Sequence, residues 1–196
     1  KWGVHDHILL DRVRKDIYFE KSPFLMSVLT LSSHPPYDIP EDDYWAEKDD
    51  ASVFVNSAHY TDKYLTLFLD SLENSPVWKN LLVIIVADHG ARFPIDISYS
   101  SPEKFYIPLL YTGGVVKMDT ILHRVCSQTD IVATILAQMN IDSKEFIFSN
   151  NSFRSDTSGF AFYTFNNGCG WVDSEGQRVI SNDNNQVILN RGQCLY

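Results

Sequence analysis

A carboxylate and an imidazole directly follow a buried strand, and they are the residues in this chain best suited to metal chemistry. The apolar run from Leu81 to Ala87 predicts that strand, and Asp88, His89 and Gly90 come next. A chain can turn at a strand end, so both side chains can point at one place, and Gly90 permits a backbone conformation that a Cβ would resist. Asp and neutral His are ordinary ligands of zinc and manganese. The structural alternative is that Asp88 caps the turn and His89 is merely exposed.

A second histidine, His34, follows another apolar segment. Phe24 to Ser33 is rich in apolar and β-prone residues and predicts a second buried strand. In an open, mostly parallel sheet, ligands bind beyond the carboxyl ends of the strands. If this strand is parallel to the one over residues 81–87, His34 and the Asp88–His89 pair lie on one rim. The alternative for His34 is a loop histidine packed on a neighbouring proline or tyrosine.

Helical patterns separate these strands and must position them. Asp6 can cap a helix that runs to about Lys21, with apolar residues at roughly helical spacing. Residues 51–74 carry one apolar stripe and predict a long helix, and residues 130–139 predict another. Residues 106–111 predict a further strand, in which Pro108 indicates an edge position or a bulge.

The end of the chain changes character, because short aromatic strands separated by Asn, Asp and Gly replace the helical patterns. Such spacing predicts an antiparallel meander. The expected strands are 159–165, 170–172, 178–181 and 186–190. The whole pattern predicts an α/β fold. We expect a mostly parallel sheet flanked by helices over residues 1–142, with residues 143–196 as an antiparallel tail packed on the same domain.

Composition allows an ordinary globular protein and argues against one class of partner. The 196 residues are enough for a sizeable core, and 44% of them are hydrophobic. The net charge of -9 repels a polyanion, so we expect no nucleic-acid partner. A phosphate or sulfate ester substrate would need local positive charge, which a bound divalent cation supplies.

The three cysteines, Cys126, Cys169 and Cys194, form no CxxC pair. A disulfide between Cys169 and Cys194 is one expectation, and free or buried thiols are the other. The sequence shows no signal peptide and no apolar run of transmembrane length. It starts at Lys1 and leads straight into patterned sequence, so we expect a fragment of a longer chain.

Three strings in this order carry a family resemblance: LTLSSHPPYDIP, then SAHYTDKYLTLFLDSL, then VIIVADHGAR. Over roughly residues 1–142 the chain resembles the carboxy-terminal half of the sulfatase-like branch of the alkaline phosphatase superfamily. Within that branch it is most similar to lipoteichoic acid synthases and related phosphoglycerol or phosphoethanolamine transferases. Residues 143–196 carry no such match.

The resemblance implies a metal-dependent enzyme that transfers or hydrolyses phosphate esters of cell-envelope lipids or glycans. Asp88 and His89 resemble two ligands of the catalytic metal, manganese or zinc, with magnesium or calcium as further options. His34 resembles the histidine that contacts the substrate phosphate or headgroup. The nucleophile and an acidic ligand would come from an amino-terminal half upstream of Lys1, with membrane helices before it and the catalytic part outside the cytoplasm.

Two other functions share this fold. One is a sulfatase that hydrolyses sulfate esters, and the other is a degenerate, non-catalytic binding domain. Retention of His34, Asp88 and His89 together favours an enzyme over a degenerate domain. Half of such a sheet would leave an unpaired edge, so we expect this chain to pair with its other half or to dimerise.

Overall fold

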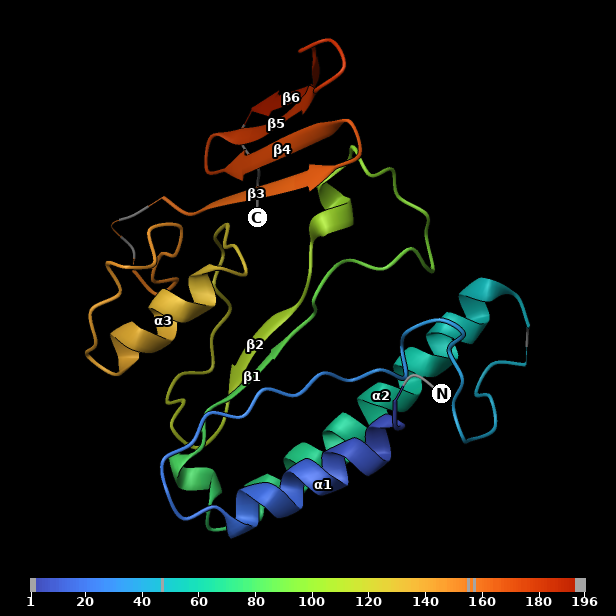
Figure 1. Cartoon of the computed structure of the whole chain (residues 1–196), viewed down its shortest axis with the longest axis vertical. Coiled ribbons are helices and arrows are strands. Elements are labelled where there is room, and N and C mark those ends of the chain that lie inside the picture. The colour runs from blue at the N-terminus through green and yellow to red at the C-terminus, as the bar shows by residue number, and fades with distance from the viewer. Residues whose placement is uncertain (1–2, 47, 155, 157, 193–196) are drawn as a thin grey trace. The chain divides into compact units, whose positions relative to one another are not determined.

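A computed structural model describes residues 3–46, 48–154, 156 and 158–192 of the chain. Contacts divide the chain into two compact units, residues 1–96 with 107–118, and residues 97–106 with 119–196 (Figure 1). The elements in chain order are α1 (Asp6–Phe19), α2 (Asp50–Glu73), the 3-10 helix η1 (Trp78–Asn80), β1 (Val83–Val86), the 3-10 helix η2 (Pro102–Phe105), β2 (Leu109–Thr112), α3 (Asp130–Gln138), β3 (Phe160–Phe165), β4 (Gly168–Asp173), β5 (Gly176–Ser181) and β6 (Val187–Gly192).

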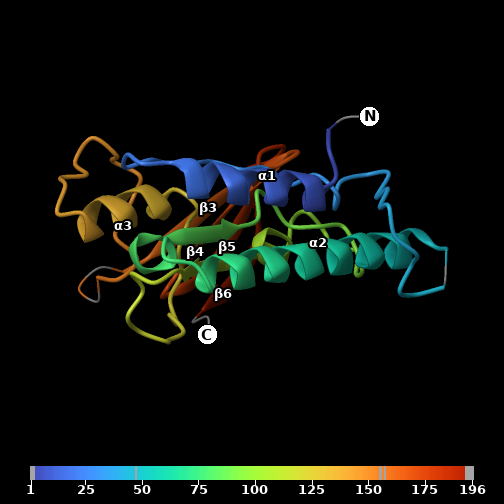
Figure 2. The ribbon, with the colours of Figure 1, turned by 90° about the horizontal axis from the view of Figure 1, so that it is seen from below.

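The core of the first unit lies between α1 and α2, which are side by side in both views (Figures 1 and 2). Each helix turns an apolar stripe toward the other, because its large apolar residues recur three or four positions apart. The buried residues of this core are Leu10, Val13, Ile17, Phe68 and Leu72.

The two helices run in the same direction. His7, at the start of α1, contacts Tyr60, and Tyr18 near its end donates its hydroxyl hydrogen to the carbonyl oxygen of Ser71 at 2.8 Å. The chain therefore has to return along α1 before α2 begins, and residues 20–33 make that return in extended conformation. This return places the residues around His34 beside the start of α1.

The sheet of the first unit pairs β1 with β2 in antiparallel register, with Val83 opposite Thr112 and Val86 opposite Leu109. The sequence predicted a mostly parallel sheet, whereas the strand pairs among the described residues are antiparallel. A parallel neighbour needs a crossover, usually a full helix. The regular structure between β1 and β2 is the short η2, and the chain comes back in the opposite direction.

The strand predicted over residues 24–33 is also corrected. In the part of the chain that the structure describes, this segment is extended but forms no ladder with another strand. Leu25 is 95% exposed and Leu29 is 74% exposed, so the apolar run is not a buried strand here. Apolar, β-prone residues favour extended backbone, but a strand also needs a neighbour that composition does not name.

The second unit contains α3 and a sheet in which β3, β4, β5 and β6 follow one another in antiparallel order (Figure 1). Its inner face is apolar because alternate residues of a strand point to one side. Tyr163, Val172 and Val179 are buried there, with Phe105 and Leu189 packed against them. The α/β class and the carboxy-terminal antiparallel meander are both confirmed, and each predicted helix is present with its bounds shifted by a few residues.

Among the described residues, every helix is either too short or too polar to cross a lipid bilayer. Cys126 and Cys169 form no disulfide within the described part of the chain. Cys194 lies outside the described residues, so a bond between Cys169 and Cys194 stays a prediction. The domain boundary at residue 142 stays a prediction as well.

Candidate functional site

Asp88 and His89 lie just beyond β1, on an exposed loop. The backbone N–H of Ala87 donates to the carbonyl of Pro108 at 3.4 Å, so the two chains stay together one residue past the strand. The strand then ends, and the side chains of Asp88 and His89 are 69% and 77% exposed. The backbone N–H of His89 donates to Asp88 Oδ1 at 2.9 Å, which fixes the carboxylate over its neighbour.

One hydrogen bond sets the tautomer of His89. Its Nδ1 lies 3.0 Å from the carbonyl oxygen of Gly90, and a carbonyl only accepts, so Nδ1 carries the hydrogen. In the neutral ring Nε2 then keeps its lone pair, as metal ligation requires. This Nε2 lies 3.6 Å from Asp88 Oδ2. Two ligands of one tetrahedral zinc at about 2.1 Å each lie about 3.4 Å apart, so the pair fits a shared ion.

The same 3.6 Å separation also fits an exposed ion pair when His89 is protonated. Among the described residues, no group of three His, Cys, Asp or Glu side chains could hold a metal ion. His34 therefore does not complete a three-ligand cluster with Asp88 and His89. The pair supplies two donors, and the ligands of a complete site would have to come from elsewhere.

His34 lies in a tight double turn. Its backbone N–H donates to the carbonyl of Leu31 at 3.0 Å, and the N–H of Tyr37 donates to the carbonyl of His34 at 2.8 Å. Tyr37 has φ 62°, a left-handed conformation that reverses the chain. The imidazole Nδ1 lies 2.9 Å from the carbonyl of Pro35, so in His34 too the hydrogen sits on Nδ1.

His34 lines an open pocket of about 290 Å³ in the first unit. Three further polar residues line it, His5, Ser32 and Asp38. No role was predicted for any of them from the sequence, although Asp38 follows His34 in the same loop. The full lining is Gly3, Val4, His5, Leu31, Ser32, His34, Pro35, Pro36 and Asp38.

The loop that follows His34 is tied to α2 through Glu41. Its carboxylate accepts hydrogen bonds from the hydroxyl of Tyr64 and from Lys63 Nζ at 2.9 Å. The hydrogen bond from Tyr64, followed by that from Lys63, lowers the pKa of Glu41. The hydrogen bond to Glu41 raises the pKa of Tyr64. Nearby, burial raises the pKa of Tyr60 to about 12. The loop therefore has one defined anchor on the long helix.

Two other polar residues, Arg92 and Asp130, have local partners. Arg92, the arginine just past the motif, lies 3.6 Å from Asp96 in an exposed ion pair and stacks over the ring of Phe93. Asp130 is buried at the start of α3 and accepts hydrogen bonds from the backbone of Ser127 and Asn150. Both arrangements stabilise local structure.

Residues 1–141 match the family model described as Sulfatase. The lipoteichoic acid synthase of Staphylococcus aureus strain USA300 is 27% identical over 196 aligned residues, which cover 86% of this chain and 29% of that protein. The lipoteichoic acid synthase-like YvgJ of Bacillus subtilis is 28% identical over 93 residues, 45% of this chain and 15% of that protein. The chain thus spans less than a third of the length of these curated relatives.

Two solved structures share the fold. A protein of the alkaline phosphatase superfamily from Vibrio parahaemolyticus superposes with a TM-score of 0.80 at 24% identity, covering 95% of this chain and 46% of that one. The lipoteichoic acid synthase LtaP from Listeria monocytogenes superposes with a TM-score of 0.68 at 18% identity, covering 96% of this chain and 54% of that one. The chain corresponds to about half of either structure.

Proposed function

This chain belongs to the sulfatase family, and from that membership we propose that the protein containing it is a metal-dependent enzyme that transfers or hydrolyses phosphate esters. Its similarity to lipoteichoic acid synthases over 86% of the chain supports the phosphate-ester branch. The substrate class that follows is an envelope lipid or glycan carrying a phosphoglycerol or phosphoethanolamine group.

Asp88 and His89 are two ligands of the catalytic metal in this proposal. The observation that carries it is the fixed tautomer of His89, which directs a lone pair on Nε2 toward the side of the ring where Asp88 Oδ2 lies at 3.6 Å. One nitrogen and one carboxylate oxygen suit manganese or zinc. A divalent cation held there neutralises the non-bridging oxygens of a phosphate ester.

His34 contacts the substrate in this proposal, from the pocket that it shares with His5 and Asp38. Nδ1 of His34 donates to the carbonyl of Pro35. In this proposal Nε2 donates to a phosphate oxygen when the ring is protonated. The carboxylate of Asp38 can accept from a hydroxyl of the alcohol group. Together these groups suit a phosphate ester of a small polyol.

The remaining parts of the enzyme belong upstream of this chain in our proposal. The nucleophile and at least one acidic metal ligand precede Lys1, since no group of three His, Cys, Asp or Glu side chains among the described residues could hold a metal ion. The catalytic part acts outside the cytoplasm and is held at the membrane by upstream helices. The exposed apolar segment around Leu25 and Leu29 supports a covering partner, and that partner is the upstream half or a second copy of the chain.

The test uses the full-length protein and the double variant Asp88→Ala/His89→Ala. We expect the purified variant to lose its bound manganese or zinc, measured by elemental analysis, and to lose at least about a hundredfold in phosphodiester turnover. Asp96→Ala, which removes an equally exposed carboxylate a few residues along, is the matched control and should retain both. Full metal content and activity in the double variant would sink the metal-site proposal.

Substrate trials separate the two ester classes. Turnover of a phosphoglycerol lipid with no turnover of an aryl sulfate supports the phosphate-ester proposal. The reverse result assigns the protein to sulfate esters. No turnover of either, with metal still bound, identifies a non-catalytic binding domain.

A further inference from the structure

Asp6 is a buried carboxylate that connects α1 to the loop before His34. Its side chain is fully buried, at 0% exposure. Oδ1 accepts hydrogen bonds from the backbone N–H groups of Leu31 at 2.9 Å and Ser32 at 3.1 Å. Oδ2 accepts from the hydroxyl of Thr61 on α2 at 2.7 Å. The backbone N–H of Asp6 donates in return to Ser32 Oγ at 3.1 Å.

This arrangement differs from the role predicted for Asp6 in the sequence, which was a helix cap. The N-cap of α1 is His5, and the carboxylate of Asp6 points away from the helix toward residues distant in sequence. A buried carboxylate is costly unless donors surround it. Its partners Leu31, Ser32 and Thr61 all donate, and they come from two different segments, so the position requires a polar side chain that reaches both.

The bonds of Asp6 lead directly to His34. The peptide of Leu31 is held by Asp6 through its N–H, and the carbonyl of Leu31 accepts from the backbone N–H of His34 at 3.0 Å. Ser33 Oγ lies 3.1 Å from Thr61 Oγ1, which is itself bonded to Asp6. Three consecutive residues before His34 are therefore fixed from one carboxylate.

The same residues form a wall of the pocket that His34 lines. Leu31, Ser32 and His34 come from the loop, and His5, the neighbour of Asp6, comes from the start of α1. Asp6 holds these two sides together from behind. A change at Asp6 thus alters the separation of His5 and His34 without removing any side chain that lines the pocket.

We propose that Asp6 is the positioning residue that holds His34, and the pocket wall with it, in place for the substrate. This inference rests on the proposed substrate contact of His34. Asp6 itself is buried behind the wall and touches no substrate. Its effect on turnover passes through the position of the imidazole, and a misplacement of about 1 Å can cost about a hundredfold in rate.

The hydrogen-bond chain predicts which substitutions at Asp6 are tolerated. In Asp6→Asn, Oδ1 still accepts from both backbone N–H groups. The new amide group donates to Thr61, whose hydroxyl then donates to Ser33, so every bond is kept with two hydrogens reversed. In Asp6→Ala all three acceptor contacts are lost and the buried donors are left without partners.

The experiment is a double-mutant cycle in the full-length protein between Asp6→Ala and His34→Ala. We expect each single variant to lower kcat/KM on a phosphoglycerol lipid by about 10- to 100-fold. We expect the double variant to be no slower than His34→Ala alone, since Asp6 acts through His34. Asp6→Asn should stay within about threefold of the parent.

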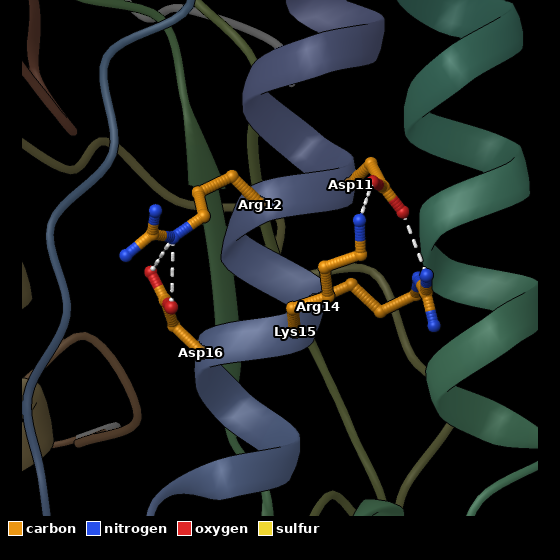
Figure 3. A network of polar contacts seen from close by, with 5 residues as sticks. All are labelled: Asp11, Arg12, Arg14, Lys15 and Asp16. Atoms are coloured by element: carbon orange, nitrogen blue, oxygen red, sulfur yellow. Dashed lines mark hydrogen bonds and ion pairs between the residues drawn. The ribbon is translucent and has the colours of Figure 1, made fainter.

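The matched control is Asp11→Ala on the same helix. Asp11 is exposed and pairs with Arg14 and Lys15 at 2.6 Å, as the close view of α1 shows (Figure 3). Exposed pairs of this kind contribute little to stability. The control should leave kcat/KM unchanged, which separates loss of an acidic side chain on α1 from loss of the bonds that Asp6 makes.

Amide hydrogen exchange gives a readout that does not depend on catalysis. Asp6→Ala should speed exchange at the amides of Leu31, Ser32 and His34, and Asp11→Ala should not. If Asp6→Ala fails to fold, Thr61→Val replaces it in the cycle and Thr61→Ser, which keeps the hydroxyl, is its control.

The outcomes are distinct. The inference is overturned if Asp6→Ala lowers kcat/KM by the same factor in the parent and in His34→Ala. It is also overturned if amide exchange in the loop is unchanged. Full activity of His34→Ala refutes the proposed substrate contact instead. In that case faster loop exchange in Asp6→Ala still establishes that Asp6 positions His34, and unchanged exchange overturns that as well.

Discussion

Single hydrogen bonds decide what the three candidate site residues can do. His34 and His89 both use Nδ1 to donate to a carbonyl oxygen of the next residue, at 2.9 and 3.0 Å. In His89 the hydrogen on Nδ1 leaves a lone pair on Nε2 of the neutral ring. A local hydrogen bond of this kind requires no particular residue elsewhere in the sequence, because its acceptor is the carbonyl of the next residue. It also explains how exposed histidines can be ready for binding before a ligand arrives.

Glu41 gives a prediction for pH at the same scale. Its pKa is lowered in the folded chain, chiefly by the Tyr64 hydroxyl and then by Lys63. A lowered carboxylate pKa means that the charged form stabilises the fold, fully above the ordinary Glu pKa of about 4.3 and less as pH falls through the folded pKa. We therefore expect the difference in unfolding free energy between the parent and Glu41→Gln to be constant above about pH 5 and to shrink below about pH 4.3.

The measurement is urea unfolding of both proteins from pH 7 to pH 3. Glu73→Gln is the control. It removes an exposed carboxylate at the end of α2 and shows what loss of a surface carboxylate does. A difference for Glu41→Gln that stays constant down to pH 3, or that grows on acidification, contradicts the assignment.

At the scale of elements, turns decide which strands meet. The tail sheet forms because each strand is followed by a tight turn, so its neighbour in sequence is its neighbour in space. Asp173 Oδ1 accepts from the backbone N–H groups of Glu175 at 2.8 Å and Gly176 at 3.1 Å, which closes the turn between β4 and β5. The extended segment 24–33 pairs with no strand in the described part of the chain.

Gly176 tests this account of the tail sheet. Its φ is +149°, and a Cβ there would lie 1.9 Å from the carbonyl oxygen of Arg191 on β6. Gly176→Ala should therefore destabilise the β5–β6 pair by more than about 1 kcal/mol. Gly192→Ala is the control, because no atom of the described residues lies within 4 Å of the Cβ position there. Amide exchange in β5 and β6 should be faster in Gly176→Ala alone, and equal rates in both variants would contradict the steric account.

At the scale of the whole molecule, the chain contains two compact units, and each builds its own core. The candidate site lies in the first unit, at the ends of β1 and of the segment before His34. It comprises the Asp88–His89 pair and the pocket that His34 lines, and the relatives that the chain matches are much longer. The described residues hold no group of three metal-ligating side chains, and the apolar residues Leu25 and Leu29 are exposed. Both observations favour our proposal that further residues complete the enzyme.

The 196-residue chain by itself should accordingly be inactive. A metal site of two exposed side chains is weak, and a nucleophile is expected only upstream of Lys1. We expect the purified chain to give no manganese- or zinc-stimulated hydrolysis of a phosphodiester, and the full-length protein to give it under the same conditions. Turnover by the chain alone that is lost in His34→Ala would show that the site is complete without upstream residues.

The sequence by itself determined the local structure, and it predicted the chemistry of the candidate residues. The helices followed from apolar residues at helical spacing, the tail meander from alternating residues between turn residues, and Asp88, His89 and His34 from their place after apolar runs. These signals are local, because helix and hairpin contacts join residues near in sequence.

Only the tertiary structure decided the pairings between distant residues. Whether β1 lies beside β2 or beside residues 24–33 depends on a partner that composition does not specify, and among the described residues that partner is β2, in antiparallel register. Asp6 shows the same limit at one residue. A helix-capping role could be predicted from its position, but its bonds to Leu31, Ser32 and Thr61 exist only because the chain returns along α1.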